Sequence, residues 1–223
     1  MHFRTSYSDI EAMLQEDVPY FDLTSRIMNL ESIDAEILFT PKSDLTVCGT
    51  EEAEHIFSRL GAETALLKKS GERAVSGQTV LRAYGNAEQL HMGWKVAQNI
   101  LEHFSGIATR TRAMVDGANR GKTGTEVCGT RKHLPGIKHL SLKALCAGGG
   151  YPHRLGISDS VLIFSNHYDL LGESKLYAPN FRRSNLNARK KKWPWKSPRF
   201  MTPSWLQKQE RTSFSSTSSL RTV

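Results

Sequence analysis

The sequence Thr130-Arg131-Lys132-His133-Leu134-Pro135-Gly136 follows a short predicted strand at 125–130 and precedes a predicted helix at 140–146. The helix is expected to end at the glycines 148–150. Pro152-His153-Arg154-Leu155-Gly156 comes next, and then the apolar run 161–164, which reads as a second strand and is followed by Ser165-Asn166-His167. Strand, helix, strand is the unit of a parallel α/β sheet or barrel, in which ligands bind at the carboxyl ends of the strands. The stretch therefore predicts an α/β fold.

Cationic side chains gather at the turn-rich junctions of this unit, namely Arg131, Lys132, His153 and Arg154. Arginine can bind a carboxylate or a phosphate through two donors, and lysine adds a point charge. Junctions of this kind carry function more often than packing. We therefore predict a site for a multiply anionic small molecule and expect these side chains around one cavity. The alternative interpretation is a solvated loop of basic residues.

Further motifs extend the pattern upstream: Glu16-Asp17-Val18-Pro19 with Asp22-Leu23-Thr24-Ser25, Val47-Cys48-Gly49, and Asn99 with Ser105-Gly106-Ile107-Ala108-Thr109. With them the chain resembles, over residues 6–167, the quinolinate phosphoribosyltransferase family, also called nicotinate-nucleotide pyrophosphorylases (carboxylating). It is most similar to the ModD-like pyrophosphorylase branch. The resemblance implies an N-terminal α+β sandwich domain followed by an open α/β barrel, of which only the first strand–helix units are present.

The resemblance also implies an activity, that of a pentosyltransferase of NAD biosynthesis. The phosphoribosyl group of phosphoribosyl pyrophosphate would pass to an acidic, pyridine-carboxylate-like acceptor, with release of pyrophosphate and with Mg²⁺ as cofactor. The implied substrate-binding residues are Lys95, Thr130, Arg131, Lys132, His153 and Arg154. No catalytic residue is assigned. A homodimer is implied as well, because Lys95 stands where the quinolinate enzymes have an arginine that reaches into the partner subunit's site.

Two positions depart from the quinolinate enzymes. Lys95 replaces an arginine, so the charge is kept but the two-pronged recognition of a dicarboxylate is lost. Phe164 stands where those enzymes have a lysine, so an apolar ring replaces a cation. The departure at Phe164 points to the ModD-like branch, and the two departures together leave the acceptor open.

The pattern of the family is expected to stop at His167. Residues 168–223 hold 12 of the 30 Lys and Arg residues and 3 of the 22 Asp and Glu residues, so residues 1–167 are near neutral. The prolines at 179, 194, 198 and 203 obstruct helices and sheets. We interpret 168–223 as a disordered basic tail and the change at Tyr168 as a truncation or a frameshift. We expect turnover at least about a thousandfold below that of a full-length relative.

The predicted domains are an N-terminal α+β domain at 1–110, the first part of the α/β barrel phosphoribosyltransferase domain at 111–167, and the basic tail at 168–223. Within the first, periodicity predicts a helix that opens with a capping box at Ser8–Glu11 and ends before Pro19. Strands are expected at 33–40, 45–47, 65–68 and 78–84, and helices at 51–60, from a cap at Asn86–Gln89 through Phe104, and again through Ile107 and Met114. The glycines 148–150 are expected to allow a helix end and a close backbone approach rather than to cradle phosphate.

Other features narrow the function classes. Cys48, Cys128 and Cys146 fit neither a disulfide framework nor a zinc spacing, so we expect reduced, mostly buried thiols and no protein-bound metal. No apolar run has the length of a membrane span or a secretory signal, which favours a cytoplasmic chain without a membrane partner.

Two functions from other classes stay open. The Lys- and Trp-rich run at 189–196 could bind nucleic acid or a membrane surface, although we favour a charged tail without a partner. A non-enzymatic remnant that dimerises through its first domain is the other alternative. The exposed strand edge of an incomplete barrel predicts association of the chain in solution.

Overall fold

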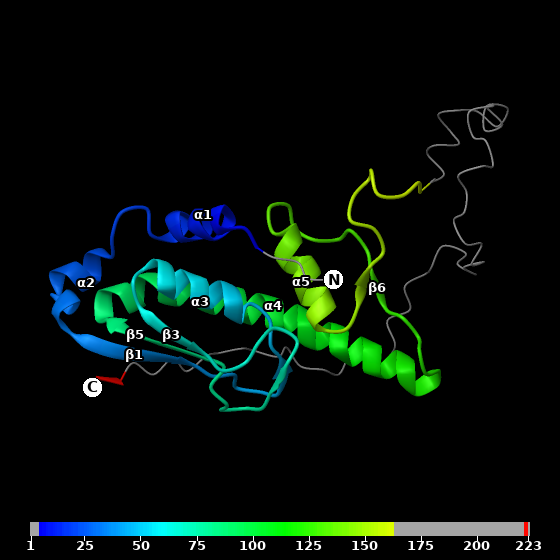
Figure 1. The fold of residues 1–223 in the computed structure, drawn as a ribbon, viewed down its shortest axis with the longest axis horizontal. Helices are drawn as coiled ribbons and strands as arrows, with labels where there is room; N and C mark the ends of the chain where they lie inside the picture. The colour runs from blue at the N-terminus through cyan, green and yellow to red at the C-terminus, as the bar shows by residue number, and fades with distance from the viewer. Residues whose placement is uncertain (1–4, 163–220, 223) are drawn as a thin grey trace. The chain divides into compact units, whose positions relative to one another are not determined.

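The computed structural model describes residues 5–162 and 221–222 (Figure 1). The chain divides into a first unit, residues 1–155 with 212–223, and a second unit, residues 156–211. Of the second unit only 156–162 are described, and they form turns and irregular backbone.

The helices are α1 (Tyr7–Asp17), α2 (Leu23–Ile27), the 3₁₀ turn η1 (Leu30–Ser32), α3 (Thr50–Arg59), α4 (Ala87–Gly121) and α5 (Lys138–Ala147). The strands are β1 (Asp34–Phe39), β2 (Leu45–Thr46), β3 (Glu63–Leu66), β4 (Arg73–Ala74), β5 (Leu81–Asn86), β6 (Cys128–Gly129), β7 (Tyr151–Pro152) and β8 (Arg221–Thr222).

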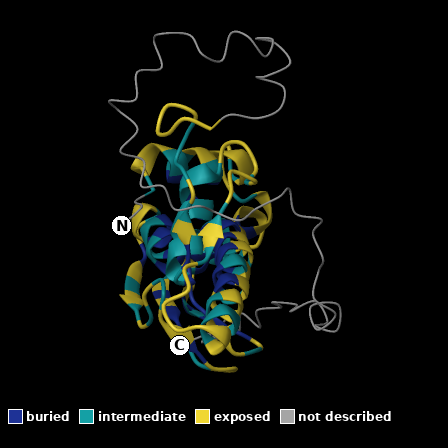
Figure 2. Ribbon diagram, turned by 90° about the vertical axis from the view of Figure 1, so that its right-hand side faces the viewer, coloured by how far each residue is buried: buried dark blue, intermediate teal, exposed yellow. Residues whose placement is uncertain are grey.

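The first unit begins with an α+β layer pair, as the sequence predicts. The sheet has the order β3-β5-β1-β8, and β1 pairs antiparallel with β5, so that Ile37 lies opposite Ala83. Along β1 the side chains of Ala35, Ile37 and Phe39 are buried in alternation, as expected for a strand with one covered face. Helices α3 and α4 cover that face (Figure 1), and the buried residues lie between the helices and the sheet (Figure 2).

Helix α4 is one continuous helix of 35 residues, so the two separate helices predicted for this region are wrong. Its start is the predicted one, because Asn86 and Gln89 form a complete capping box. The helix continues past Gly106, although glycine costs about 1 kcal/mol in a helix interior, and the neighbouring Ser105 bonds the backbone of Cys48. The Cys48 amide donates to Ser105 Oγ at 2.9 Å, and that hydroxyl donates to the Cys48 carbonyl at 3.1 Å.

Smaller differences concern the ends of elements. Helix α1 begins two residues earlier than predicted, because the side chain of Ser6, and not that of Ser8, accepts from the backbone of Asp9. Strand β3 lies two residues before its predicted position, and β5 begins three residues later than predicted and ends two later, at Asn86. The residue at the predicted domain boundary, 110, lies inside α4.

The strand–helix–strand unit is present, but its return strand is not the predicted one. Strand β6 pairs parallel with β7, with Cys128 opposite Tyr151 and Gly129 opposite Pro152, and α5 connects the two. Val161 and Leu162 lie in no helix or strand, and Ile163 and Phe164 are outside the described residues. The return strand therefore comes directly after the glycine triplet. Its two residues form no apolar run, so the sequence pattern did not mark them as a strand.

The glycine triplet closes α5 and packs against α4. The Gly149 amide donates to the Cys146 carbonyl and the Gly150 amide to the Leu145 carbonyl, the hydrogen-bond pair of a Schellman motif. A Cβ on Gly148 would lie 2.5 Å from both the Ala108 carbonyl oxygen and the Thr111 Cβ. The predicted role of these glycines, a helix end and a close backbone approach, is confirmed.

Three further predictions can be compared with the described residues. No helix in this part of the chain is long and apolar enough to cross a membrane. All three cysteines are free, but Cys128 is exposed and only Cys48 is fully buried. The predicted basic tail lies outside the described residues except for Arg221 and Thr222.

Candidate functional site

The residues predicted to bind an anion follow two neighbouring strands. Thr130, Arg131 and Lys132 come directly after β6, and His153 and Arg154 come directly after β7. Because the two strands are parallel, their carboxyl ends lie at the same edge of the sheet. The backbone connects the two ends, since the His153 amide donates to the Gly129 carbonyl at 2.9 Å. Two residues earlier on each side, the Tyr151 amide donates to the Val127 carbonyl, also at 2.9 Å.

A cavity of about 370 Å³ opens beside this edge. Its polar wall is formed by Thr130, Lys132 and His133 from the loop after β6, His103 from α4, and Ser141 from α5. Of the four cations predicted to surround one cavity, only Lys132 lines this one. Arg131, His153 and Arg154 are not part of its lining. Arg131, Lys132 and His153 are exposed, and Arg154 is half-buried.

Two histidines of this cavity, His103 and His133, were not among the predicted site residues. His103 lies on α4, far from the loop in sequence, and only tertiary packing brings it to the cavity. The His133 Nε2 atom is buried and has no hydrogen-bond partner among the described residues, whereas its Nδ1 lies 3.3 Å from the Leu134 carbonyl oxygen. Both rings can donate or accept, depending on which nitrogen carries the proton.

Lys95 lies on the exposed side of α4 and does not line the cavity that Lys132 lines. Lys95 is predicted to act in the site of a partner subunit, so that role depends on a second copy of the chain and stays a prediction. Within one copy, the structure brings together Thr130 to Lys132 with His153 and Arg154, and it leaves Lys95 apart from them in the elements described.

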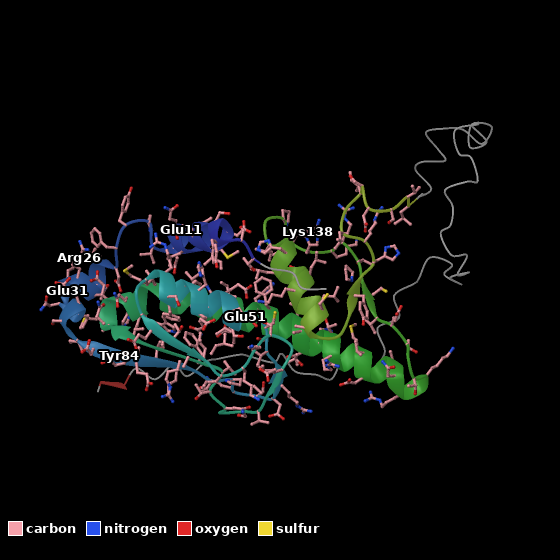
Figure 3. All side chains as sticks on the ribbon, in the orientation of Figure 1. Glu11, Arg26, Glu31, Glu51, Tyr84 and Lys138 are labelled. Atoms are coloured by element: carbon pink, nitrogen blue, oxygen red, sulfur yellow. The ribbon has the colours of Figure 1, made fainter. Side chains whose placement is uncertain are left out.

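A second polar cluster, which the sequence analysis did not predict, joins α5 to α3. Lys143 Nζ donates to Glu51 Oε2 at 2.9 Å and to Glu52 Oε2 at 2.6 Å. The side chains of Lys143 and Glu52 are 14% and 4% exposed, so this is a largely buried ion pair. The backbone amide and the hydroxyl of Ser70 both donate to Glu51. Figure 3 labels Glu51 at the start of α3, at the end of this helix nearest to α5.

The environment of this cluster shifts three pKa values. Burial disfavours the charged form of Glu51, but the donors of Ser70 and the charge of Lys143 outweigh it and lower the pKa of Glu51 to about 2. Burial likewise disfavours the charge of Lys143, yet Glu52 and Glu51 raise the pKa of its ammonium group. Burial raises the pKa of the Cys48 thiol to about 12, so this thiol stays protonated and is a poor nucleophile.

These shifts predict how stability depends on pH. A carboxyl whose folded pKa is depressed contributes stability above its ordinary value, here 4.5, and loses that contribution as the pH falls towards about 2. The raised pKa of Lys143 acts only at the alkaline end, so it adds no slope in acid. We therefore expect the free energy of unfolding to decline below pH 4.5, and Glu51→Gln to flatten that decline. Urea unfolding at neutral pH and at about pH 3 measures the effect; equal losses in both proteins would contradict it.

Comparison with known proteins agrees with this arrangement. The family model "Quinolinate phosphoribosyl transferase, N-terminal domain" matches residues 22–105, and the model for the C-terminal domain of the same family matches residues 107–191. The second match continues beyond residue 167, where the sequence motifs were expected to stop.

Individual relatives match over most of the chain. A protein named pyrophosphorylase ModD, from Rhodobacter capsulatus, is 41% identical over 167 residues, which are 75% of this chain and 64% of the relative. The crystal structure of nicotinate-nucleotide pyrophosphorylase from Ehrlichia chaffeensis superimposes with a TM-score of 0.73 at 29% identity, covering 82% of this chain and 68% of that one. NadC from Streptococcus pyogenes gives a TM-score of 0.69 at 28% identity and covers 77% and 64%. The chain thus spans slightly less than two thirds of the length of the ModD relative.

Proposed function

Because the chain belongs to the quinolinate phosphoribosyltransferase family, we propose that it transfers a phosphoribosyl group from phosphoribosyl pyrophosphate to an acidic acceptor. The anomeric carbon of the ribose leaves the pyrophosphate oxygen and bonds to the acceptor, and pyrophosphate departs. The observation that carries the proposal is the parallel pairing of β6 with β7, which places Thr130 to Lys132 and His153 with Arg154 at one sheet edge. The reaction needs cations around two anionic groups and a fixed geometry between them.

The residue types suit separate parts of such a substrate pair. Arg131 offers a planar fork to a carboxylate or a phosphate, and Lys132 adds a compact charge at the cavity wall. Arg154, from the second strand end, supplies another fork, and His153 and Thr130 add hydrogen-bonding groups. We assign all five to substrate binding and none to proton transfer, since catalysis of this kind depends mainly on position and charge.

Mg²⁺ is part of the proposal as a companion of phosphoribosyl pyrophosphate. Among residues 5–162 and 221–222, no three His, Cys, Asp or Glu side chains come together in a metal-binding group. Mg²⁺ is commonly held by substrate phosphates together with one or two carboxylates. The described residues therefore do not form a metal site of their own, and no step of the proposal depends on one.

The ModD-like branch and the second subunit are finer parts of the proposal. The similarity to the ModD relative and the lysine at position 95 support an acceptor of the pyridine-carboxylate class other than quinolinate. Lys95, exposed on α4, would act in the site of the partner in a homodimer. The family resemblance also supports a cytoplasmic location. No feature of the described residues favours nucleic-acid binding.

Pyrophosphate release tests the proposal directly. The full chain is incubated with phosphoribosyl pyrophosphate, Mg²⁺ and a panel of pyridine carboxylates. We expect release that depends on the acceptor and that falls at least about tenfold in Arg131→Ala, because a charge-assisted pair contributes roughly 1.5–3 kcal/mol. Arg73→Ala is the matched control. It also removes an exposed arginine, whose partner Asp44, the residue before β2, lies 3.5 Å away.

Three results would contradict the proposal: no release above background, release that is independent of the acceptor, or equal losses in Arg131→Ala and Arg73→Ala. Running the Rhodobacter capsulatus relative beside this chain measures how far its turnover falls below that of a longer family member.

A further inference from the structure

One face of α5 contacts the N-terminal layer pair at three successive turns. His139 Nε2 lies 3.7 Å from Asp9 Oδ2 on α1. Lys143, one turn later, reaches the two glutamates of α3. At Ala147, one further turn on, the backbone approaches the loop before β4, since its carbonyl oxygen lies 3.7 Å from the place that a Cβ would take on Gly71. Residues four apart share one side of a helix, so these contacts form one continuous stripe.

Of the two ion pairs in this stripe, the one formed by Lys143 is the shorter and the more buried. Glu52 is 4% exposed, and both of its oxygens accept from Lys143 Nζ, at 2.8 Å and 2.6 Å. Thr5 Oγ1 also donates to Glu52 Oε1, at 2.7 Å. One lysine neutralises only one of the two carboxylates, and the Glu51 carboxylate also accepts from the amide and the hydroxyl of Ser70. Every charged atom of the cluster therefore has a partner.

A buried ion pair adds little net stability compared with apolar residues of the same size, but removing one partner is costly because the other charge is left unpaired. Such a pair therefore fixes a geometry more than it strengthens the fold. Here the fixed geometry is that of α5 on α3, and α5 is the connection between β6 and β7. Its first turn follows the loop of Arg131 and Lys132, and its last turn leads through the glycines to His153.

We infer that Lys143 is a positioning residue: by joining α5 to Glu51 and Glu52, it sets where the ends of β6 and β7 stand relative to each other. The inference deepens the proposed function, since these ends carry the proposed anion-binding residues. Lys143 itself lies on the α3 side of α5, is absent from the lining of the cavity that contains Lys132, and acts through the helix.

Amide hydrogen exchange tests the position of the strand ends without any ligand. The reporters are the amides of Tyr151 and His153, which bond across β6 and β7, and the internal control is the amide of Val80, which bonds to Phe39 in the sheet. In Lys143→Met we expect exchange at both reporters to accelerate about tenfold while Val80 is unchanged, because the loss is a local opening. Lys143→Arg keeps a cation within reach of both glutamates and is expected to restore protection.

Binding of pyrophosphate, measured on the same proteins by NMR titration, is the second readout. We expect the dissociation constant to rise severalfold in Lys143→Met and to return in Lys143→Arg. Arg59→Gln, which breaks the exposed pair of α3 with Glu11 at 3.0 Å, is the matched control and should change neither readout. If Lys143→Met does not fold, Lys143→Met with Glu52→Gln removes the unpaired buried carboxylate and takes its place.

The two hypotheses fail in different ways. If the unsubstituted chain does not bind pyrophosphate, the proposed function fails, and exchange at Tyr151 and His153 still decides the role of Lys143. If a folded Lys143→Met variant, or the double variant, exchanges these amides at the rate of the unsubstituted chain, Lys143 does not position the strand ends and the inference is overturned.

Discussion

Replacing Gly148 with alanine is expected to destabilise the folded chain by about 3 kcal/mol, the upper end of the usual cost of overpacking. The added Cβ would lie 2.5 Å from the Ala108 carbonyl oxygen and from Thr111 Cβ. One of these atoms belongs to the backbone of α4, so it cannot move aside as a flexible side chain would. The φ angle of Gly148 is −75°, which alanine adopts without strain, so the loss reports the contact between α5 and α4 alone.

Gly106→Ala, on the long helix α4 that Gly148 packs against, is the matched control. A Cβ at Gly106 meets no atom within 4 Å, and alanine is about 1 kcal/mol more favourable than glycine inside a helix. We therefore expect this variant to be more stable than the unsubstituted chain. Urea unfolding followed by circular dichroism compares the three proteins. Equal stability of Gly148→Ala and Gly106→Ala would show that the glycine triplet does not hold α5 against α4.

The second large effect concerns ligand binding. We expect the unsubstituted chain to bind pyrophosphate with roughly millimolar affinity, about −4 kcal/mol. Replacing Arg131 and Lys132 together with alanine removes two charge-assisted contacts, each contributing roughly 1.5–3 kcal/mol, and should weaken binding at least about a hundredfold. Because both side chains are exposed, raising the salt concentration should weaken binding to the unsubstituted chain in the same direction.

Arg73→Ala with Lys68→Ala removes two cations elsewhere on the surface and serves as the control for overall charge. NMR titration with pyrophosphate at constant ionic strength gives the dissociation constants. A loss of equal size in both double variants would mean that pyrophosphate responds to net charge, and not to a site at the end of β6.

Much of the fold could be predicted from local patterns. The capping box of Asn86 and Gln89, the alternation along β1 and the glycine triplet each depend on residues close in sequence, and each is present in the structure. The parallel unit could be predicted because strand, helix and return strand have few possible arrangements. The family could be predicted because its motifs keep their order over more than a hundred residues.

The parts that could not be predicted depend on contacts between distant residues. The return strand β7 is two residues long and carries Tyr151 and Pro152, so neither length nor alternation marks it. Helix α4 runs unbroken past Gly106, and beside that glycine the hydroxyl of Ser105 bonds a backbone 57 positions away. In the sequence nothing distinguishes Lys143 from an exposed helix lysine. Its two carboxylate partners lie on α3, more than ninety positions away.

The central claim is that the carboxyl ends of β6 and β7 form one anion site. The most direct measurement is an amide chemical-shift titration of the full chain with pyrophosphate. The claim predicts that residues 129–133 and residues 153–155 shift together, with one dissociation constant, and that both sets of shifts disappear in Arg131→Ala with Lys132→Ala. Shifts at one strand end only, shifts with two different dissociation constants, or no shifts at either end would contradict it.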